Sequence, residues 1–334
     1  MLRDYKNGFK RFMEFGGWRL FVAYIRMGTL WPDTKALLHC IKEGREFKTA
    51  YPEMIGTVEA ILAKKYGYIL DEASKDYSSD FVDGTTKPKI VWTCWLQGME
   101  DAPYMVKKCV ESQKKALQDY EHRVLTLENY HQWVEVPEYI EKKFRKGRIP
   151  RALFTDLLRL AVLKKYGGVW LDASVLFTGF ENEKLLNRLH KIEQSEFTIF
   201  RYFQRGKKEP VGLSNWFIAA HPNDFVVSTV LDMLLAYWKD YNCTVDYYIM
   251  HLFISMCLNA VPSIAESMPR ENSYHSIMLG SVLAKDYNED WWNDVKAHVF
   301  LHKLNYRKAD EADEAAKNPH SFYNKIFGST PALL

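Results

Sequence analysis

The sequence predicts an α/β fold with strands that pair in parallel at its centre. A β-branched and aromatic run at residues 89–95 is followed by a helix-like segment and then by a second strand-like run at residues 122–127. A third strand-like run, residues 169–177, directly follows an amphipathic helix that ends at Gly167. Units of strand, helix and strand build parallel sheets, and the ligands of such sheets gather at the carboxyl ends of the strands.

The first 80 residues are predicted to be mostly helical, and a polar connector is expected at residues 71–88. Six basic residues precede position 31: Arg3, Lys6, Lys10, Arg11, Arg19 and Arg26. The same segment has only two acidic residues, Asp4 and Glu14, so its net charge is 6 − 2 = +4. The whole chain has a net charge of +3, which leaves the remaining residues at 3 − 4 = −1. Aromatic residues recur there at helical spacings: Phe9, Phe12, Phe15, Trp18, Phe21 and Tyr24. Such a segment either rests on an anionic membrane surface or packs its aromatic face on the main domain.

The middle of the chain carries clear helix boundaries. Pro137 favours the first turn of a helix that Gly147 ends. Residues 153–166 predict a second helix, with lysines in its last turn and Gly167 as its stop. The strand predicted at 169–177 alternates, which places Trp170, Asp172 and Ser174 in a row on one face.

The second half predicts a strand and turn at residues 214–222, helices at 224–237 and 245–256, and a strand that runs into a basic loop at 297–308. The longest stretch without Asp, Glu, Lys or Arg, residues 247–265, includes a histidine and a proline. We expect a buried helix and its exit loop there rather than a membrane span.

Composition excludes several classes of function. The five cysteines are widely spaced and form no CxxC pair, which indicates a reducing, cytoplasmic setting without a zinc knuckle. Charges interrupt the first apolar residues, so no secretory signal is expected. No basic patch with stacking aromatics continues beyond the first 30 residues, which argues against nucleic-acid binding. The absence of GxGxxG after the first strand argues against a dinucleotide-dependent oxidoreductase.

Asp156 and Arg159 lie three residues apart on the predicted helix, so their side chains share one face. Spacing alone leaves two interpretations open: a structural ion pair, or two groups that hold a polar ligand. Trp170 taken alone is more often a core residue than a ligand platform.

The combined segment FTDLLRLxxLxxYGGVWLDAS, residues 154–174, is far more specific than its parts. With PKIVWTCWLQG at 88–98 and SNWFIAAHP at 214–222, it resembles the capsular polysaccharide synthesis glycosyltransferases, which are relatives of glycosyltransferase family 32 and, more distantly, of the glucosylating domain of large clostridial toxins. The resemblance covers about residues 88–305. It implies a GT-A-like fold: a Rossmann-type central mixed sheet with flanking helices, here with an extra helical N-terminal region. We therefore expect a helical region at 1–80, a catalytic domain at 81–310 and a C-terminal tail at 311–334.

The resemblance also implies roles for residues of the nucleotide-sugar site. Trp95 and Thr93 would line the base pocket, and Asp156 would accept from ribose or sugar hydroxyls. Arg159 would reach the donor sugar or its phosphate, next to the aromatic Trp170. The remaining implied positions are Asn215 and Asp246, for sugar and acceptor contacts, and His302 and Lys303, near the region that closes over the diphosphate.

A divalent cation is the implied cofactor. Relatives end the strand in two alternating carboxylates, whereas this chain has Asp172 and then Ser174. One carboxylate and one hydroxyl can hold Mn²⁺ or Mg²⁺, because such ions keep water and phosphate oxygens among their ligands. The serine implies weaker metal binding, with Lys303 sharing the work of the cation.

The resulting expectation is a hexosyltransferase that moves a sugar from a nucleotide sugar such as a UDP-sugar to a lipid-linked saccharide acceptor, with retention, in capsular or other surface polysaccharide synthesis. It would act in the cytoplasm of a bacterium, at the inner face of the membrane through residues 1–30, without a nucleic-acid partner. The alternative is a non-catalytic scaffold that binds a nucleotide sugar or glycan.

Overall fold

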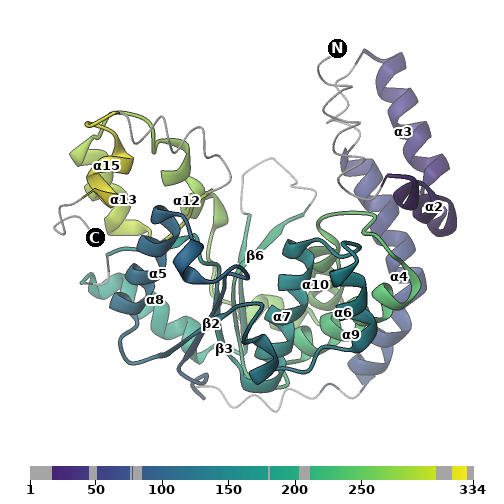
Figure 1. Cartoon of the computed structure of the whole chain (residues 1–334), viewed down its shortest axis with the longest axis horizontal. Helices are drawn as coiled ribbons and strands as arrows, with labels where there is room; N and C mark the ends of the chain where they lie inside the picture. The colour runs from purple at the N-terminus through teal and green to yellow at the C-terminus, as the bar shows by residue number, and fades with distance from the viewer. Residues whose placement is uncertain are drawn as a thin grey trace.

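A five-stranded mixed sheet with helices on both faces forms the centre of the computed structural model, which describes residues 17–44, 51–75, 77, 85–179, 181–202, 211–305 and 318–328 (Figure 1). The strand order is β2-β1-β3-β6-β5. The bounds are β1 Ile90–Cys94, β2 Glu121–Leu125, β3 Gly168–Leu171, β5 Phe197–Arg201 and β6 Leu213–Ala220. Strands β1, β2 and β3 are parallel, whereas β6 is antiparallel to both β3 and β5. The predicted α/β class with a central mixed sheet and flanking helices is therefore confirmed.

The described α-helices are α2 Trp18–Met27, α3 Leu30–Lys42, α4 Tyr51–Lys75, α5 Tyr104–Ala116, α6 Glu138–Arg145, α7 Arg151–Tyr166, α8 Glu183–Gln194, α9 Phe225–Asp240, α10 Ile249–Ala260, α11 Pro262–Ser267, α12 Ser273–Ile277, α13 Glu289–His298 and α15 Phe322–Phe327. Short 3₁₀ turns are η2 Met99–Asp101, η3 Tyr130–Gln132 and η4 Leu279–Ser281. None of these helices is both long and apolar enough to cross a membrane.

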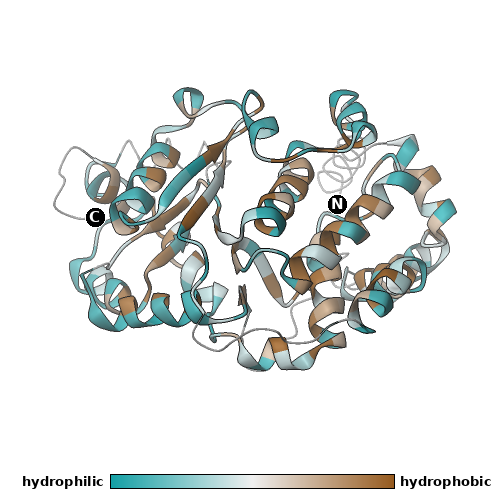
Figure 2. Ribbon diagram, turned by 90° about the horizontal axis from the view of Figure 1, so that it is seen from below, coloured by the Kyte–Doolittle hydropathy of each residue, from teal (hydrophilic) through white to brown (hydrophobic). Residues whose placement is uncertain are grey.

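Alternate residues of the strands divide the interior into two cores. Trp92, Trp170 and Ile218 pack with α4, α7, α9 and α10 on one face of the sheet. Val169 and Leu171 point the other way and pack against α8, as the period of two in a strand requires. Hydrophobic residues gather where the helices meet the sheet (Figure 2).

Two glycines permit the tight passage from α7 into β3. Gly167 has φ +65° and Gly168 has φ +97°, a region that side chains rarely adopt. A Cβ on Gly168 would lie 2.5 Å from the carbonyl oxygen of Ile90 in β1. The Gly-Gly pair therefore lets β3 pair closely with β1 and brings the end of β3 to the same edge of the sheet as the end of β1.

The prediction of one continuous strand at residues 169–177 is wrong. Strand β3 ends at Leu171, and a turn follows in which the Val175 amide donates to the Asp172 carbonyl oxygen at 3.0 Å. The chain then forms β4, Val175–Phe177, which pairs antiparallel with β7, Leu301–Lys303, in a separate two-stranded sheet. Asp172 and Ser174 consequently sit on a turn between two sheets, not on one face of a strand.

Other boundaries differ from the prediction by a few residues. Helix α4 extends to Lys75, into the predicted connector. Helix α10 begins at Ile249 rather than at residue 245, because the Tyr248 amide donates to Asp246 Oδ1 at 2.7 Å in the preceding turn. The buried helix predicted within residues 247–265 is confirmed, and all five cysteines are free. The division into 1–80, 81–310 and 311–334 stays a prediction.

Candidate active site

A cavity of about 1220 Å³ opens where β1 and β3 end and where β6 begins. Several elements contribute to its wall: the end of β1, helices α7 and α10, the turn after β3, and strands β6 and β7. Most of the predicted site residues line it, namely Trp95, Asp156, Arg159, Asp172, Ser174, Asn215 and Lys303. The cavity therefore lies at the strand ends where an α/β fold holds its ligands.

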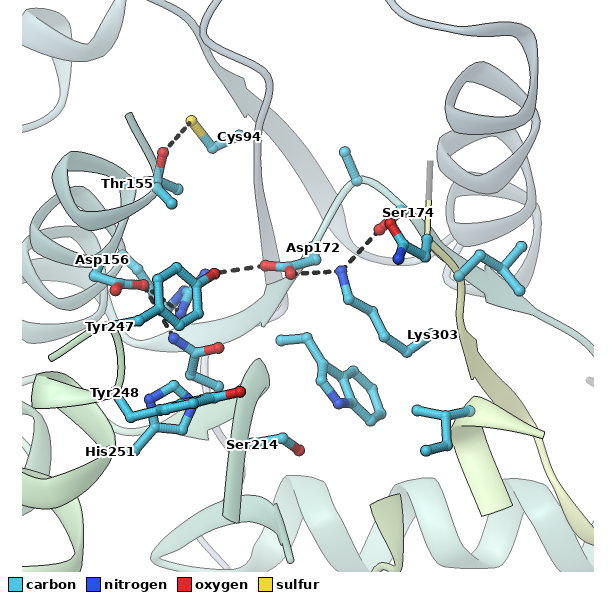
Figure 3. Close-up of a pocket in the computed structure, with 18 of the residues that line it drawn as sticks. Cys94, Thr155, Asp156, Asp172, Ser174, Ser214, Tyr247, Tyr248, His251 and Lys303 are labelled. Atoms are coloured by element: carbon cyan, nitrogen blue, oxygen red, sulfur yellow. Dashed lines mark hydrogen bonds and ion pairs between the residues drawn. The ribbon is translucent and has the colours of Figure 1, made fainter. Parts of the chain in front are cut away.

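Asp172 is held on both carboxylate oxygens. Its Oδ1 accepts hydrogen bonds from Arg159 Nη2 and Trp170 Nε1, each at 3.0 Å. Its Oδ2 accepts from Lys303 Nζ at 2.7 Å, and the same ammonium donates to Ser174 Oγ at 2.7 Å. Figure 3 shows the Lys303 ammonium between Asp172 and Ser174. The turn thus carries an anion between two fixed cations.

Asp156 and Arg159 form an ion pair that also belongs to the cavity wall. Arg159 Nη1 donates to Asp156 Oδ1 at 2.9 Å, and Asn215 Nδ2 donates to the same oxygen at 3.0 Å. The Arg159 guanidinium lies 4.7 Å from the Trp170 ring centroid. The sequence left open whether Asp156 and Arg159 form a structural ion pair or hold a ligand. In the structure they form an ion pair, and both residues line the cavity.

Burial and the neighbouring charges set the pKa values of the two carboxyl groups in opposite directions. Burial is the largest effect on Asp156; it outweighs the lowering by Arg159 and, together with the nearby Asp172, raises the pKa of Asp156 to about 6. Burial also acts to raise the pKa of Asp172, but Lys303 and Arg159 together outweigh it and hold that pKa below its ordinary value. Asp172 is therefore ionised at neutral pH.

The residues expected to hold a divalent cation do not fit one as they are arranged. The Lys303 ammonium fills the space between Asp172 Oδ2 and Ser174 Oγ, the two oxygens that would be ligands. Within the described ranges, no three His, Cys, Asp or Glu residues gather in a group that could hold a metal ion. A dication at this place would require Lys303 to move away. The expectation of Mn²⁺ or Mg²⁺ stays a prediction.

Four predicted residues lie off the cavity wall. Thr93 is buried and donates to the Leu171 carbonyl oxygen at 3.0 Å. Trp170 is buried beneath Arg159 and reaches the site only through its bond to Asp172. His302, in β7, is buried and has its Nε2 2.8 Å from Thr178 Oγ1. Asp246 accepts a hydrogen bond at 3.3 Å from Oη of Tyr51, which does line the cavity. A ligand in the cavity can therefore contact the seven predicted residues that line it, but not these four.

His251 and the tyrosines before it are cavity residues that the sequence analysis did not select. His251, Tyr247 and Tyr248 line the cavity from the start of α10 and the turn before it (Figure 3). His251 is buried, burial lowers its pKa to about 3, and its Nδ1 has no hydrogen-bond partner among the described residues. The imidazole is therefore neutral. The only sequence signal was a histidine that interrupts the longest uncharged stretch.

Comparison with known proteins identifies the family. A model of the capsular polysaccharide synthesis protein family matches residues 46–326, and the chain belongs to that family. Among solved structures, the chain is similar to a protein titled PaToxG Glycosyltransferase, with 13% sequence identity and a TM-score of 0.36, over 63% of this chain and 83% of the other. A search of the curated proteins finds no match.

Proposed function

We propose that the chain is a glycosyltransferase that moves a sugar from a nucleotide-sugar donor to an acceptor hydroxyl during surface polysaccharide synthesis. The single observation that carries the proposal is the arrangement of Lys303 and Arg159 around Asp172 in a large cavity at the strand ends. Two fixed cations at one end of such a cavity suit a diphosphate, which carries negative charge in the donor and gains more as it leaves. Membership in the capsule synthesis family supports the same class of reaction.

The cavity wall offers separate groups for each part of the donor. Trp95 is half-buried at the end of β1 and presents an indole that suits stacking on a nucleotide base. Asp156 uses Oδ1 for Arg159 and Asn215, which leaves Oδ2 to accept from a ribose or sugar hydroxyl. Asn215 has a carboxamide oxygen that can accept a second sugar hydroxyl. A base such as uracil would stack on Trp95 in this cavity. The polar side chains of β6 and α10 would then determine which donor sugar binds.

The reaction breaks the bond between the anomeric carbon and the diphosphate oxygen. The electron pair of that bond stays on the diphosphate, where the Lys303 ammonium and the Arg159 guanidinium stabilise the developing charge. The acceptor hydroxyl oxygen forms the new bond to the anomeric carbon, and its proton passes to the departing diphosphate oxygen. This front-side course, which retains configuration, needs no covalent nucleophile. Asp172 holds the two cations in position, since both of its oxygens are engaged by them and by Trp170.

A binding scaffold without turnover is the second candidate. The observation that favours it is that internal ion pairs engage both oxygens of Asp172, so the carboxylate meets no ligand directly. Such a protein would bind donor sugars but would not release the nucleoside diphosphate.

The test is a panel of nucleotide sugars, first by thermal shift and then by release of the nucleoside diphosphate. A ligand at 100 times its dissociation constant stabilises the folded state by about 2.7 kcal/mol, which is readily measured. Slow hydrolysis of the stabilising donor, with and without Mn²⁺, supports a transferase. A donor that stabilises but is never hydrolysed, even with a saccharide acceptor, supports the scaffold, and no stabilisation by any nucleotide sugar contradicts both.

A further inference from the structure

Helices α2 and α3 present an apolar face that no described residue covers. Trp18 is 76% exposed and Trp31 is 74% exposed, the highest values among the exposed large hydrophobic residues. Val22 and Ile25 in α2 and Leu38 in α3 are each more than half exposed. Val22 is four residues after Trp18, and Ile25 is three residues after Val22, so the three side chains form one stripe along α2. Trp31 and Leu38 are seven residues apart and therefore lie on one side of α3. We call these five exposed side chains of the two helices the apolar face.

The other side of α2 is packed against the main body. Ala23 and Met27 are buried in the main core, and Tyr24 Oη donates to the Val245 carbonyl oxygen at 3.4 Å. Helix α2 therefore has apolar residues on both sides, and packing uses only one of them. The interpretation that the aromatic pattern packs on the main domain thus accounts for one side of α2 only. The earlier aromatics at positions 9, 12 and 15 lie outside the described residues.

A second cavity, of about 320 Å³, opens beside the apolar face and is lined by arginines. Arg19 and Arg26 come from α2, and Arg148 comes from the loop after α6. Trp18 and Val22 also line this cavity, which makes it continuous with the apolar face. Arg148 Nη1 donates to Asn242 Oδ1 at 3.2 Å, whereas Arg148 Nε is buried and has no partner within the described chain. We call this cavity the arginine pocket; its described lining residues include no Asp or Glu.

Positive charge continues from the arginine pocket onto the end of α6. Residues 142–148 read KKFRKGR, and Lys142, Arg145 and Lys146 are exposed. Lys143 Nζ donates to the Tyr241 carbonyl oxygen at 2.9 Å, which fixes this basic segment beside the residues of the pocket. Glu141 offsets part of the charge through its ion pair with Arg145 at 3.1 Å. The fold thus joins two basic segments that lie more than a hundred residues apart in the sequence.

We propose that the apolar face and the arginine pocket dock the protein on an anionic phospholipid bilayer, with a lipid phosphate in the pocket. Tryptophan favours the boundary between headgroups and acyl chains, and basic residues beside it are drawn to anionic lipids. The guanidinium group matches a phosphate in charge and geometry. The combination of charge and apolar surface favours this occupant over a second copy of the chain, which would bring a like charge to the same face.

One loop links the docking surface to the candidate active site. Tyr241, Asn242 and Cys243 line the arginine pocket, and Tyr247 and Tyr248, a few residues further, line the large cavity. If the proposed sugar transfer uses an acceptor on a lipid, that acceptor would pass this loop on its way from the bilayer to the large cavity. This part of the inference rests on the proposed function. The docking itself does not need the reaction, so it is measured without donor or acceptor.

The experiment measures co-sedimentation of the full chain with vesicles of phosphatidylcholine, alone or mixed with phosphatidylglycerol, at low and high salt. The pocket variant combines Arg19→Gln, Arg26→Gln and Arg148→Gln, and the face variant combines Trp18→Ser and Trp31→Ser. A charge-matched control replaces three exposed lysines with glutamine: Lys114, Lys184 and Lys191. Leu186→Ser, on exposed Leu186 of α8, is the apolar control. Thermal melting compares the folding of all variants.

We expect wild type to bind the anionic vesicles and not the neutral ones, with binding that weakens at high salt. The pocket variant should bind on the order of 100-fold more weakly, and the face variant should lose binding as well. Both controls should bind like wild type. Equal binding to neutral and anionic vesicles, an equal loss in the lysine control, or sedimentation of wild type without vesicles through self-association would overturn the proposal. Failure here leaves donor binding untouched, so it is distinguishable from failure of the proposed function.

Discussion

Lys303→Met tests whether a fixed ammonium does the work of a metal cation in the candidate active site. Methionine keeps an unbranched apolar side chain that is one atom shorter than lysine, and it removes the ammonium group with its charge. In wild type, Lys303 Nζ is 2.7 Å from Asp172 Oδ2 and 2.7 Å from Ser174 Oγ. The substitution therefore vacates the space between two oxygens and leaves Arg159 as the remaining cation on Asp172.

The expected loss follows from the position of the ammonium. The Lys303 side chain is 24% exposed, so an effective dielectric of about 20 is appropriate, at which two unit charges about 4 Å apart attract by about 4 kcal/mol. Removal of one preorganised donor from developing negative charge costs about 2.7 to 4 kcal/mol in enzymes. We therefore expect kcat to fall by about 10²- to 10³-fold.

Stability provides a second readout with a defined sign. Because Lys303 and Arg159 hold the pKa of Asp172 low against the effect of burial, ionised Asp172 stabilises the fold above its ordinary pKa, and this contribution disappears as pH falls through the lowered value. Lys303→Met should therefore lower the melting temperature at neutral pH more than at acid pH. Lys164→Met is the matched control, since Lys164 pairs with Asp232 at 3.2 Å, away from the cavity.

The assay is release of the nucleoside diphosphate from the stabilising donor, with EDTA or with added Mn²⁺. Wild type should tolerate EDTA, and Mn²⁺ should partly restore Lys303→Met, because the vacated space then has two oxygen ligands for a cation. If Lys303→Met turns over donor as fast as wild type, the ammonium does not have this role. Loss of all wild-type turnover in EDTA would refute it too, and would support the divalent cation that the family resemblance implies.

Four further variants test the rest of the site and its scaffold. Donor binding should strengthen as pH rises through about 6, where Asp156 ionises and becomes the stronger acceptor, and Asp156→Asn should remove this step in calorimetry. Trp95→Ala should weaken donor binding by about 1 to 3 kcal/mol through lost stacking; unchanged affinity would place the base elsewhere. Asp172→Asn should lower turnover by about 10²-fold or more while donor still binds, because the two cations lose their fixed position. Gly168→Ala should destabilise the fold by about 3 kcal/mol in urea unfolding, since φ is +97° and the new Cβ would meet the Ile90 carbonyl oxygen; wild-type stability would contradict the close contact.

The sequence predicted those parts of the site that depend on local signals. Helix α7, the Gly-Gly stop and the start of β3 follow from helix caps, glycine conformation and alternation over a short segment. Asp156 and Arg159 were recognised as a pair because three residues along a helix place side chains on one face. The mixed central sheet came from the family resemblance, since the strand order and the reversed direction of β6 leave no short-range pattern.

Lys303 was expected beside Asp172 from the family resemblance, but other residues that folding brings together over long distances escaped prediction. The arginine pocket joins Arg26 of α2 to Arg148 after α6, and nothing in either segment indicates the other. The sequence used His251 only as an argument against a membrane span, whereas in the structure it lines the cavity from a helix that begins at Ile249. In each case the missing information is how the helices pack, which hydrophobic periodicity does not contain.

The contact between Asp172 and Lys303 shows why the division of the predicted strand matters for chemistry. Had residues 169–177 continued as one strand, they would have stayed in the central sheet, and β7 would have had no partner there. Because the chain turns after Leu171, Val175 pairs with Lys303 in the ladder of β4 and β7, and this register carries the ammonium to the turn. A one-residue shift would point Lys303 to the opposite face. The same turn that breaks the alternating carboxylate pattern thus supplies a cation in its place, so in this chain the serine and the lysine are two parts of one arrangement.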